Sequence, residues 1–218
     1  MLTLMKPCKQ ALVTGATGGI GSAVCELLVE RGWAVLAADL DGPVALDVRD
    51  AAAWEALDLP ALDLLVHCAG VSTAGALAKV SPQDIRAMVE VNLLGPIVGT
   101  RACLGALNPG ARVVLVGSML GSHGVANGAT YSATKAGLRG FAEALSLEHP
   151  ELTVVHLQPG VVDTPMAGDM PGERLDPRVV AEQVLAANAL HAPVGRDARW
   201  FVWLARWAPW IVRRSQSR

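Results

Sequence analysis

The sequence predicts a doubly wound α/β domain, with a parallel sheet and helices on both faces of it. Short apolar runs alternate with longer stretches of helical periodicity, which is typical of strands separated by helices. The runs are apolar throughout, as expected for strands that are covered on both sides. A chain of 218 residues with 52% hydrophobic content can bury one such core. We therefore expect a single domain.

The apolar runs and the helical stretches give the predicted elements in order. The predicted strands are 11–13, 34–38, 62–67, 112–116 and 152–157, and the predicted helices are 21–31, 51–56, 82–91, 95–107, 129–148 and 177–189. Gly32 follows the first helix, and Ser81-Pro82 opens the third, as is usual at helix ends. We assign the domain to residues 1–198 and treat residues 199–218 as its tail.

A glycine-rich segment joins the first predicted strand to the first predicted helix. It reads Thr14-Gly-Ala-Thr-Gly-Gly-Ile-Gly21. Glycines allow close approach of the backbone to a pyrophosphate, and the free amides of a helix N-terminus stabilise its charge. The spacing of Gly15, Gly19 and Gly21 differs from Gly-x-Gly-x-x-Gly, so a purely structural turn is the alternative. The position between strand and helix favours a Rossmann-type dinucleotide site.

The second predicted strand leads to Asp39, about twenty residues beyond the glycines. A carboxylate here can accept hydrogen bonds from an adenosine ribose and repels a 2'-phosphate. Neither Gly18 nor Leu40 is a basic residue that could receive that phosphate. The sequence therefore predicts NAD(H) in preference to NADP(H). The alternative is an ordinary polar strand end before the turn at Asp41-Gly42.

The only tyrosine, Tyr131, is followed four residues later by Lys135, one of four lysines. Residues i and i+4 of a helix share a face, so the ammonium can lower the pKa of the phenol toward the range of a general acid or base. Taken alone, such a pair is more often a polar surface pair. The other motifs of the chain favour a proton-transfer pair.

From about residue 10 to residue 164 the chain resembles the short-chain dehydrogenase/reductase family. The residues that carry the resemblance are the glycine segment, Asp39, Asp47-Val48, Ala69-Gly70, Asn92, Ser118, Tyr131-x-x-x-Lys135 and Pro159-Gly160 with Thr164. The resemblance implies an oxidoreductase that interconverts a secondary alcohol and a ketone with NAD(H).

The resemblance also implies the role of each residue. Tyr131 would exchange a proton with the substrate oxygen, and Ser118 would hydrogen-bond that oxygen. Lys135 would lower the pKa of Tyr131 and bind the nicotinamide ribose, while Asn92 would hold a water of the proton relay. The implied cofactor-binding residues are Gly15, Thr17, Gly19, Ile20, Gly21, Asp39, Asp47, Val48, Ala69, Gly70, Tyr131, Lys135, Pro159, Gly160, Val162 and Thr164. Taken singly, Ser118, Asn92 and Thr164 could instead be turn, helix-break and capping residues.

Two features depart from the family pattern. His67-Cys68 stands where the family has two asparagines, and without a second ligand at useful spacing we expect a hydrogen-bonded structural His67 and no metal. The segment 165–176 is short for a substrate lid and offers only Met166 and Met170 to a pocket, which suggests an open cleft or one completed from elsewhere. Together with the apolar tail it indicates a hydrophobic substrate.

The tail is rich in tryptophan and arginine. Trp200, Trp203, Trp207 and Trp210 would form one stripe on a helix, beside Arg199, Arg206 and Arg213. Such a stripe suits a weak membrane or lipid contact. Packing on its own domain or on a partner subunit is the favoured alternative. Residues 200–203 could also be the last strand of the sheet, and Pro209 would interrupt a helix.

The bulk properties exclude some partners and locations. A formal charge of -2 supplies no basic field for nucleic acid. Four widely spaced cysteines indicate reduced core residues, and with no leader pattern or apolar run of about 18 residues we expect a cytoplasmic protein.

By family analogy we expect a homodimer or homotetramer acting on a small carbonyl or alcohol. The other class considered is a non-catalytic NAD(H)-binding regulatory or scaffold protein, against which the retained Asn92, Ser118, Tyr131 and Lys135 argue.

Overall fold

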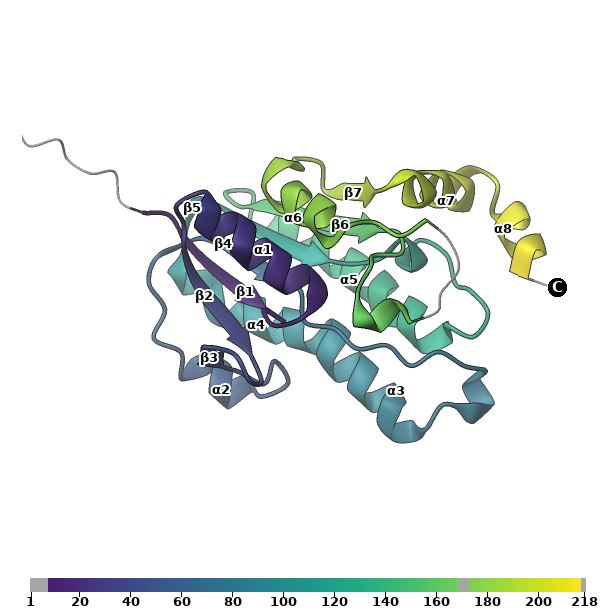
Figure 1. Ribbon diagram of the computed structural model, residues 1–218, viewed down its shortest axis with the longest axis horizontal. Coiled ribbons are helices and arrows are strands. Elements are labelled where there is room, and N and C mark those ends of the chain that lie inside the picture. Colours follow the sequence, from purple (N-terminus) through teal and green to yellow (C-terminus); the bar gives the residue numbers. More distant parts are fainter. Residues whose placement is uncertain (1–7, 169–172, 217–218) are drawn as a thin grey trace, which may run out of the picture.

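The computed structural model describes residues 8–168 and 173–216, and these form a seven-stranded sheet in the order β3-β2-β1-β4-β5-β6-β7 (Figure 1). All neighbouring strands are parallel. The strands are β1 (Gln10–Thr14), β2 (Ala34–Asp39), β3 (Val44–Ala45), β4 (Leu62–His67), β5 (Leu107–Val116), β6 (Thr153–Pro159) and β7 (His191–Val194). Because the order reverses between β1 and β4, a crevice opens at the carboxyl ends of the strands, where ligands of such sheets bind.

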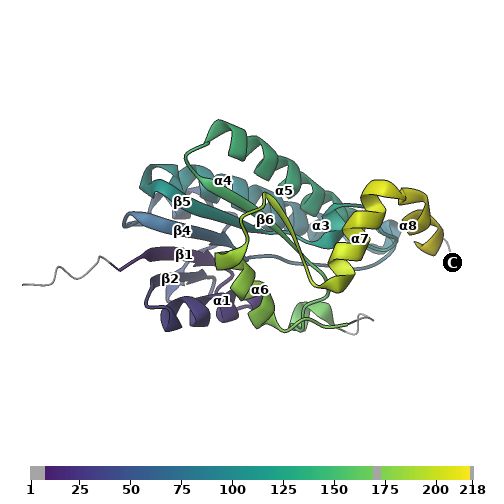
Figure 2. The same ribbon diagram turned by 90° about the horizontal axis from the view of Figure 1, so that it is seen from above.

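Helices cover both faces of the sheet (Figure 2), so the predicted doubly wound fold is confirmed. One face packs on α1 (Gly19–Glu30) and α6 (Pro177–Ala186), and the other on α2 (Ala51–Glu55), α4 (Gly95–Cys103) and α5 (Ala129–Glu148). Successive strand residues point to opposite faces, so Val13 belongs to the first core and Leu12 to the second. This is why the strands are apolar throughout.

Most predicted elements are correct to within a few residues, but the predicted helix 95–107 extends too far. Helix α4 ends at Cys103, a 3₁₀ turn spans Leu104–Ala106, and β5 already begins at Leu107. Leu107 pairs with Leu62 on β4, and a register shift follows before Leu64. The long-range pairing therefore draws a helix-like sequence into the sheet.

The structure corrects the prediction at the end of the sheet. The last strand is β7, which the sequence analysis missed, and residues 200–203 belong to α7 (Arg196–Trp207). Pro193 lies within β7, where a proline is tolerated because the strand is at the edge. Pro209 opens a further helix, α8 (Pro209–Gln216), as the sequence suggested. The short edge strand β3 was also missed.

The helix that carries Asn92 is the only one in the described part of the chain that is long and apolar enough to cross a membrane. It runs from Pro82 to Ala106 and contains α3 (Pro82–Val89), a π-helical turn η2 (Glu90–Leu94) and α4. Here it packs on α2 and α5 as part of the layer over the sheet. Core helices of soluble proteins can reach the same length and hydropathy.

The four cysteines are unpaired, but they are not all core residues as the sequence suggested. Cys103 is buried, Cys25 and Cys68 are partly buried, and Cys8 is exposed. Cys8 precedes β1, and its thiol donates to the carbonyl oxygen of Gly32 at 2.8 Å. Cys25, Cys68 and Cys103 pack in the two cores as small apolar side chains, whereas Cys8 does not.

Candidate active site

The glycine segment forms a tight turn between β1 and α1. Gly15 has a positive φ of 65°, and a Cβ there would lie 2.5 Å from the backbone nitrogen of Ala69. Only glycine allows this contact, so the turn lies directly on the end of β4. The N-cap residue of α1 is Gly18, which has no side chain to bond the first-turn amides. These amides, including those of Gly19 and Ile20, are suited to an anionic ligand.

A second segment closes on the glycine turn from the far side of the crevice. A Cβ on Gly19 would lie 2.5 Å from Cγ2 of Thr164, which follows β6. The structure therefore places the glycine segment, which the sequence assigned to a pyrophosphate, against Thr164, which it assigned to the nicotinamide side. Gly21 lies buried in the first turn of α1, where a Cβ would strike the carbonyl oxygen of Gly15.

Asp39 turns its carboxylate toward the glycine turn. Its Oδ2 accepts hydrogen bonds from the backbone nitrogen of Thr17 at 2.9 Å and from its Oγ1 at 2.7 Å, and Oδ1 accepts from the nitrogen of Leu40 at 2.8 Å. Burial raises the pKa of Asp39, but the bonds from Thr17 and Leu40 together outweigh it and hold the pKa below its ordinary value. The carboxylate is therefore ionised at neutral pH.

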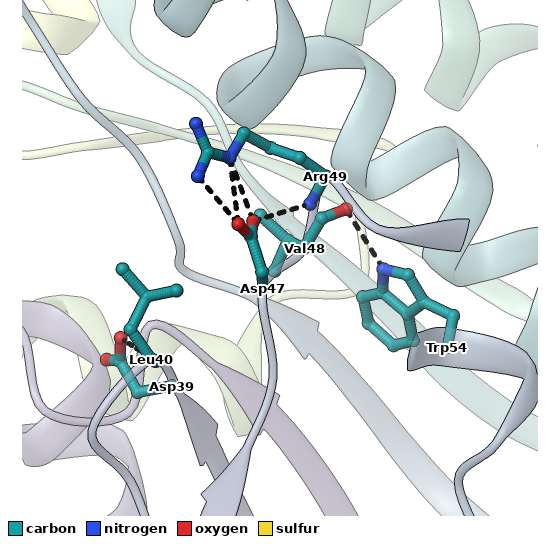
Figure 3. A network of polar contacts seen from close by, with 6 residues as sticks. All are labelled: Asp39, Leu40, Asp47, Val48, Arg49 and Trp54. Atoms are coloured by element: carbon teal, nitrogen blue, oxygen red, sulfur yellow. Dashed lines mark hydrogen bonds and ion pairs between the residues drawn. The ribbon is translucent and has the colours of Figure 1, made fainter. Parts of the chain in front are cut away.

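Asp47 and Val48 lie beyond the end of β3, near Asp39 (Figure 3). Asp47 forms an ion pair with Arg49, whose Nη2 lies 2.6 Å from Oδ2. Val48 is buried, and its carbonyl oxygen accepts a hydrogen bond of 3.0 Å from Nε1 of Trp54. The segment that the sequence assigned to the adenine side is therefore held by α2 and carries one arginine that the sequence analysis did not consider.

Tyr131 lies in the first turn of α5, and its hydroxyl is hydrogen-bonded to Ser118. Burial raises the pKa of Tyr131, and the bond from Ser118 lowers it only in part. The expectation that Lys135 would bring this pKa down is therefore wrong for the protein alone. The reason is desolvation, which raises the pKa more than the bond from Ser118 lowers it. The Lys135 Nζ lies over the tyrosine ring, 5.6 Å from its centroid.

Lys135 is a buried residue of α5, one turn after Tyr131, and its Nζ donates to the carbonyl oxygen of Val116 at 2.9 Å. Burial lowers the pKa of Lys135 to about 8. A Cβ on Gly70 would lie 3.9 Å from this Nζ and 3.3 Å from Oδ1 of Asn92. Gly70 thus leaves the narrow gap between these two side chains open.

Asn92 is fully buried in the π-helical turn η2. Its Oδ1 accepts from the nitrogen of Val71 at 2.8 Å, and its Nδ2 donates to the carbonyl oxygen of Val71 at 2.8 Å. Both the oxygen and the nitrogen of the Asn92 side-chain amide are thus bonded to the segment after β4. A π turn places an extra residue in the helix and is frequent at functional sites. The water that Asn92 would hold stays a prediction.

Ser118, Tyr131 and Lys135 line one cleft of about 320 Å³ at the carboxyl ends of the strands. The predicted cofactor residues that also line it are Ile20, Gly70, Pro159, Gly160, Val162 and Thr164. The remaining predicted cofactor residues lie around the glycine turn and at or beyond the ends of β2, β3 and β4, and neither they nor Asn92 line the cleft. The cleft therefore takes in the Tyr131 end of the predicted site, while Asp39 does not line it.

Much of the cleft wall comes from residues that were not predicted from the sequence. The cleft is also lined by Ser72, Thr73, Ala74, Met119, Leu120 and the residues 125–128. Asn127 has a positive φ of 59°. The Asn127-Gly128 pair is a typical turn signal in the sequence, but such a turn does not by itself predict that these residues line a cleft. Met166 lines the cleft as predicted, whereas Met170 lies outside the described residues.

His67 is buried, as the sequence analysis expected for a structural residue. Its Nε2 lies 3.0 Å from Oγ1 of Thr100, and burial lowers the pKa of His67 to about 3. The imidazole is therefore neutral. Within residues 8–168 and 173–216, no group of three or more His, Cys, Asp or Glu side chains is placed to hold a metal ion.

The fold and the residues gathered at its crevice define a nucleotide-binding oxidoreductase of the Rossmann type. The model of the short chain dehydrogenase family matches residues 43–174. The chain belongs to the short-chain dehydrogenase/reductase family, whose members bind a nicotinamide cofactor.

Individual relatives are similar over most of their length. The chain is 31% identical over 194 residues to 3-oxoacyl-[acyl-carrier-protein] reductase of Homo sapiens, covering 77% of this chain and 81% of the relative. It is 33% identical over 218 residues to cis-4-hydroxycyclohexanecarboxylate dehydrogenase of Sinomonas cyclohexanicum, covering 87% of this chain and 83% of the relative. A short chain dehydrogenase from Burkholderia cenocepacia, solved in complex with NADP, has a TM-score of 0.85 and 25% identity, covering 97% of this chain and 98% of that one.

Proposed function

We propose that this protein interconverts a secondary alcohol and a ketone with a nicotinamide cofactor, acting on a hydrophobic substrate. The observation that carries the proposal is the convergence of Ser118, which follows β5, with Tyr131 and Lys135 of α5 on one cleft with a largely apolar wall. Met119, Leu120 and Val125 supply apolar surface beside the polar groups. This combination suits a carbonyl on an apolar body.

Tyr131 is the group that would donate the proton to the carbonyl oxygen. Because burial raises its pKa, the phenol is protonated at neutral pH, which favours the direction in which the ketone is reduced. Ser118 is bonded to the tyrosine hydroxyl and would orient the same substrate oxygen. Lys135 keeps its ammonium beside the tyrosine ring and would bind ribose hydroxyls.

The residues present fit a dinucleotide. The glycine turn brings free backbone amides next to Ala69 and Thr164 with no room for side chains, as a pyrophosphate requires. Asp39 with Thr17 would hold the adenosine ribose, Asp47 and Val48 the adenine side, and Pro159, Gly160, Val162 and Thr164 the nicotinamide side. When bound, the nicotinamide supplies the hydride.

We retain NAD(H) as the preferred cofactor, because the ionised carboxylate of Asp39 would repel a 2'-phosphate. NADP(H) is the second candidate. It is favoured by the Burkholderia cenocepacia relative solved with NADP and by an alcohol dehydrogenase from Thermococcus sibiricus solved with 5-hydroxy-NADP. Arg49, the arginine near Asp39 in Figure 3, is paired with Asp47, which reduces its availability to a phosphate.

The names of the sequence relatives suggest two substrate types. One relative acts on a 3-oxoacyl group carried by acyl-carrier protein, and another on a hydroxycyclohexanecarboxylate. A β-keto thioester and a cyclic ketone share a ketone on an apolar body, in keeping with the apolar wall of the cleft.

A homodimer or homotetramer and a cytoplasmic location remain our proposals, the latter supported by four unpaired cysteines.

The competing function is a cofactor-binding regulatory or scaffold protein without turnover. It has no support in the site, because a protein that only binds nucleotide does not need a protonated phenol and a serine aimed at the same point of an apolar cleft. Fold alone does not decide between the two, so the distinction must be made by assay.

The test is to follow NADH and NADPH absorbance across a panel of ketones, β-keto thioesters and quinones. Tyr131→Phe removes the proton and retains the ring, so turnover should fall by about 10² or more while cofactor binding stays nearly unchanged. Lys135→Ala should reduce both. Undiminished turnover in Tyr131→Phe would refute the catalytic assignment, and cofactor binding with no turnover on any carbonyl would favour the regulatory protein.

A further inference from the structure

The C-terminal helices present an apolar face that nothing in the described protein covers. Trp200, Trp203, Trp207 and Trp210 are 65%, 51%, 62% and 65% exposed. Within α7, positions 200, 203 and 207 lie on one side of the helix, and Trp210 continues from the start of α8. We call these four residues the tryptophan face. Exposed apolar patches of this kind usually mark an interaction site.

The tryptophan face is not a consequence of loose packing of the tail. On the opposite side of α7, Ala198 is fully buried, and Ala208 and Val212 are buried at the junction with α8 and within it. Helix α7 contacts β7 and the 3₁₀ turn η4 (Met119–Gly121). The tail is therefore docked on the domain by one side, and its tryptophans point away. The tail thus packs on its own domain, as one of the sequence alternatives expected, but its tryptophans take no part in that packing.

The charge beside the tryptophan face is positive. Residues 197–214 contain four arginines and one aspartate, although the whole chain has a formal charge of -2. Arg196, just before them, is paired with Glu173. Arg199, Arg206 and Arg213 are exposed, and the Arg206 guanidinium lies 5.4 Å from the ring centroid of Trp207. Tryptophan with arginine suits the boundary between acyl chains and anionic headgroups, because the indole ring is apolar and its N–H remains hydrated.

The same charge disfavours a second copy of the chain as the partner. An interface related by a two-fold axis joins the same patch from both subunits, so it would gather the arginines of both copies in one contact. Like charges brought together without counter-charges destabilise such a contact. An anionic bilayer instead offers a negative charge wherever an arginine lies.

We propose that α7 and α8 bind the surface of an anionic lipid bilayer, with the tryptophan face in the interfacial layer and the arginines on the headgroups. Helix α7 abuts η4, and Met119 and Leu120 of η4 line the cleft. Both views place α7 and α8 past the end of β7, beyond the carboxyl end of the sheet (Figures 1 and 2). Binding would hold the cleft close to the lipid. If the proposed function is correct, membrane-dissolved ketones would reach the cleft directly.

The experiment measures sedimentation of the full-length protein with vesicles. One set contains phosphatidylcholine alone and the other roughly 30% phosphatidylglycerol. We expect binding to the anionic set, weakened by salt on the order of 0.5 M. Trp203→Ser with Trp207→Ser should lower the partition coefficient by about tenfold or more, and Arg199→Gln with Arg206→Gln should lower it on anionic vesicles. Tryptophan emission should shift to the blue on binding.

The matched control replaces exposed apolar residues elsewhere, Val29→Ser with Leu147→Ser, and should bind like the wild type. Thermal unfolding and cofactor binding check that each variant is folded, and neither readout depends on turnover, so lipid binding and the proposed function fail separately. No sedimentation with either vesicle set, or equal loss in the control, would overturn the proposal. A dimer that the double tryptophan variant dissociates, without vesicle binding, would assign the face to a subunit interface.

Discussion

Tyr131 can be titrated directly, because it is the only tyrosine of the chain. The ultraviolet absorbance of tyrosinate in the free protein should have a midpoint above the ordinary value of 10, since burial raises the pKa. Ser118→Ala should raise it further by removing a bond that lowers it. Ser122→Ala, whose hydroxyl is bonded to Gln158, is the control and should change nothing. A midpoint below 10 would mean that Lys135 dominates after all.

Lys135 should make stability depend on pH in a defined window. Burial lowers its pKa to about 8, so between about pH 8 and 10.5 the unfolded chain binds more protons and the free energy of unfolding rises with pH. Lys135→Met should remove this rise. The difference between wild type and variant should change by on the order of 3 kcal/mol across the window.

Denaturant unfolding at several pH values measures this difference. The buried thiols lower the free energy of unfolding as the pH rises, but they do so equally in wild type and variant, so their contribution cancels in the difference. Lys79→Met, at an exposed position, is the matched control and should follow the wild type. A difference that is flat from pH 8 to 10.5 would show that the lysine is not desolvated.

Asp39 should control cofactor preference. Asp39→Arg removes the charge that repels a 2'-phosphate and adds one that attracts it, so the ratio of kcat/KM for NADH over NADPH should fall by about tenfold or more. Asp41→Arg makes the same change of charge on the exposed turn two residues later and should have little effect. An equal shift in both variants would mean that the net charge, and not the contact with Thr17, sets the preference.

At the scale of elements, the contact of α4 with α2 depends on Gly99. A Cβ on Gly99 would lie 2.4 Å from the ring of Trp54, which is buried. Gly99→Ala should therefore reduce the free energy of unfolding by about 1–3 kcal/mol. Combining it with Trp54→Leu should cost less than the sum of the two single changes, because the smaller side chain makes room.

Gly140 supplies the matched control for a glycine in a helix. It lies exposed in α5, and a Cβ there would have no neighbour within 4 Å. Gly140→Ala should stabilise the protein by about 0.5–1 kcal/mol through helix propensity. Chemical denaturation of both variants checks the pair. If Gly99→Ala were also stabilising, the packing of α4 on Trp54 would have to be looser than described.

At the scale of the whole molecule, thiol labelling should report global unfolding. Only Cys8 is exposed, while burial raises the pKa of Cys25 to about 11 and of Cys103 to about 12. At about pH 8 one of the four thiols should react quickly in the native protein, and the others only after unfolding. Mass spectrometry of alkylated protein counts them. Cys8→Ser should abolish the fast reaction, and fast labelling of Cys103 would contradict the fold.

The fold was largely predictable because the patterns that indicate strands and helices are both local in the sequence. Apolar runs without alternation mark strands covered on two faces, and β4 and α5 have the bounds that the sequence predicted. The errors arise where a distant partner decides. Leu107 becomes a strand residue through its pairing with Leu62, and β7 is a strand only because the edge of β6 is available to it.

The sequence by itself determined the parallel sheet, the glycine turn and the pairing of Tyr131 with Lys135 on α5, since these follow from local pattern and helical spacing. Only the tertiary structure decided the protonation of the site and the direction in which the tail faces. Burial raises the pKa of Tyr131 against the effect expected of its neighbour, and packing of Ala198 turns the tryptophans outward. Desolvation and packing depend on atoms contributed by distant parts of the chain, which no local pattern contains.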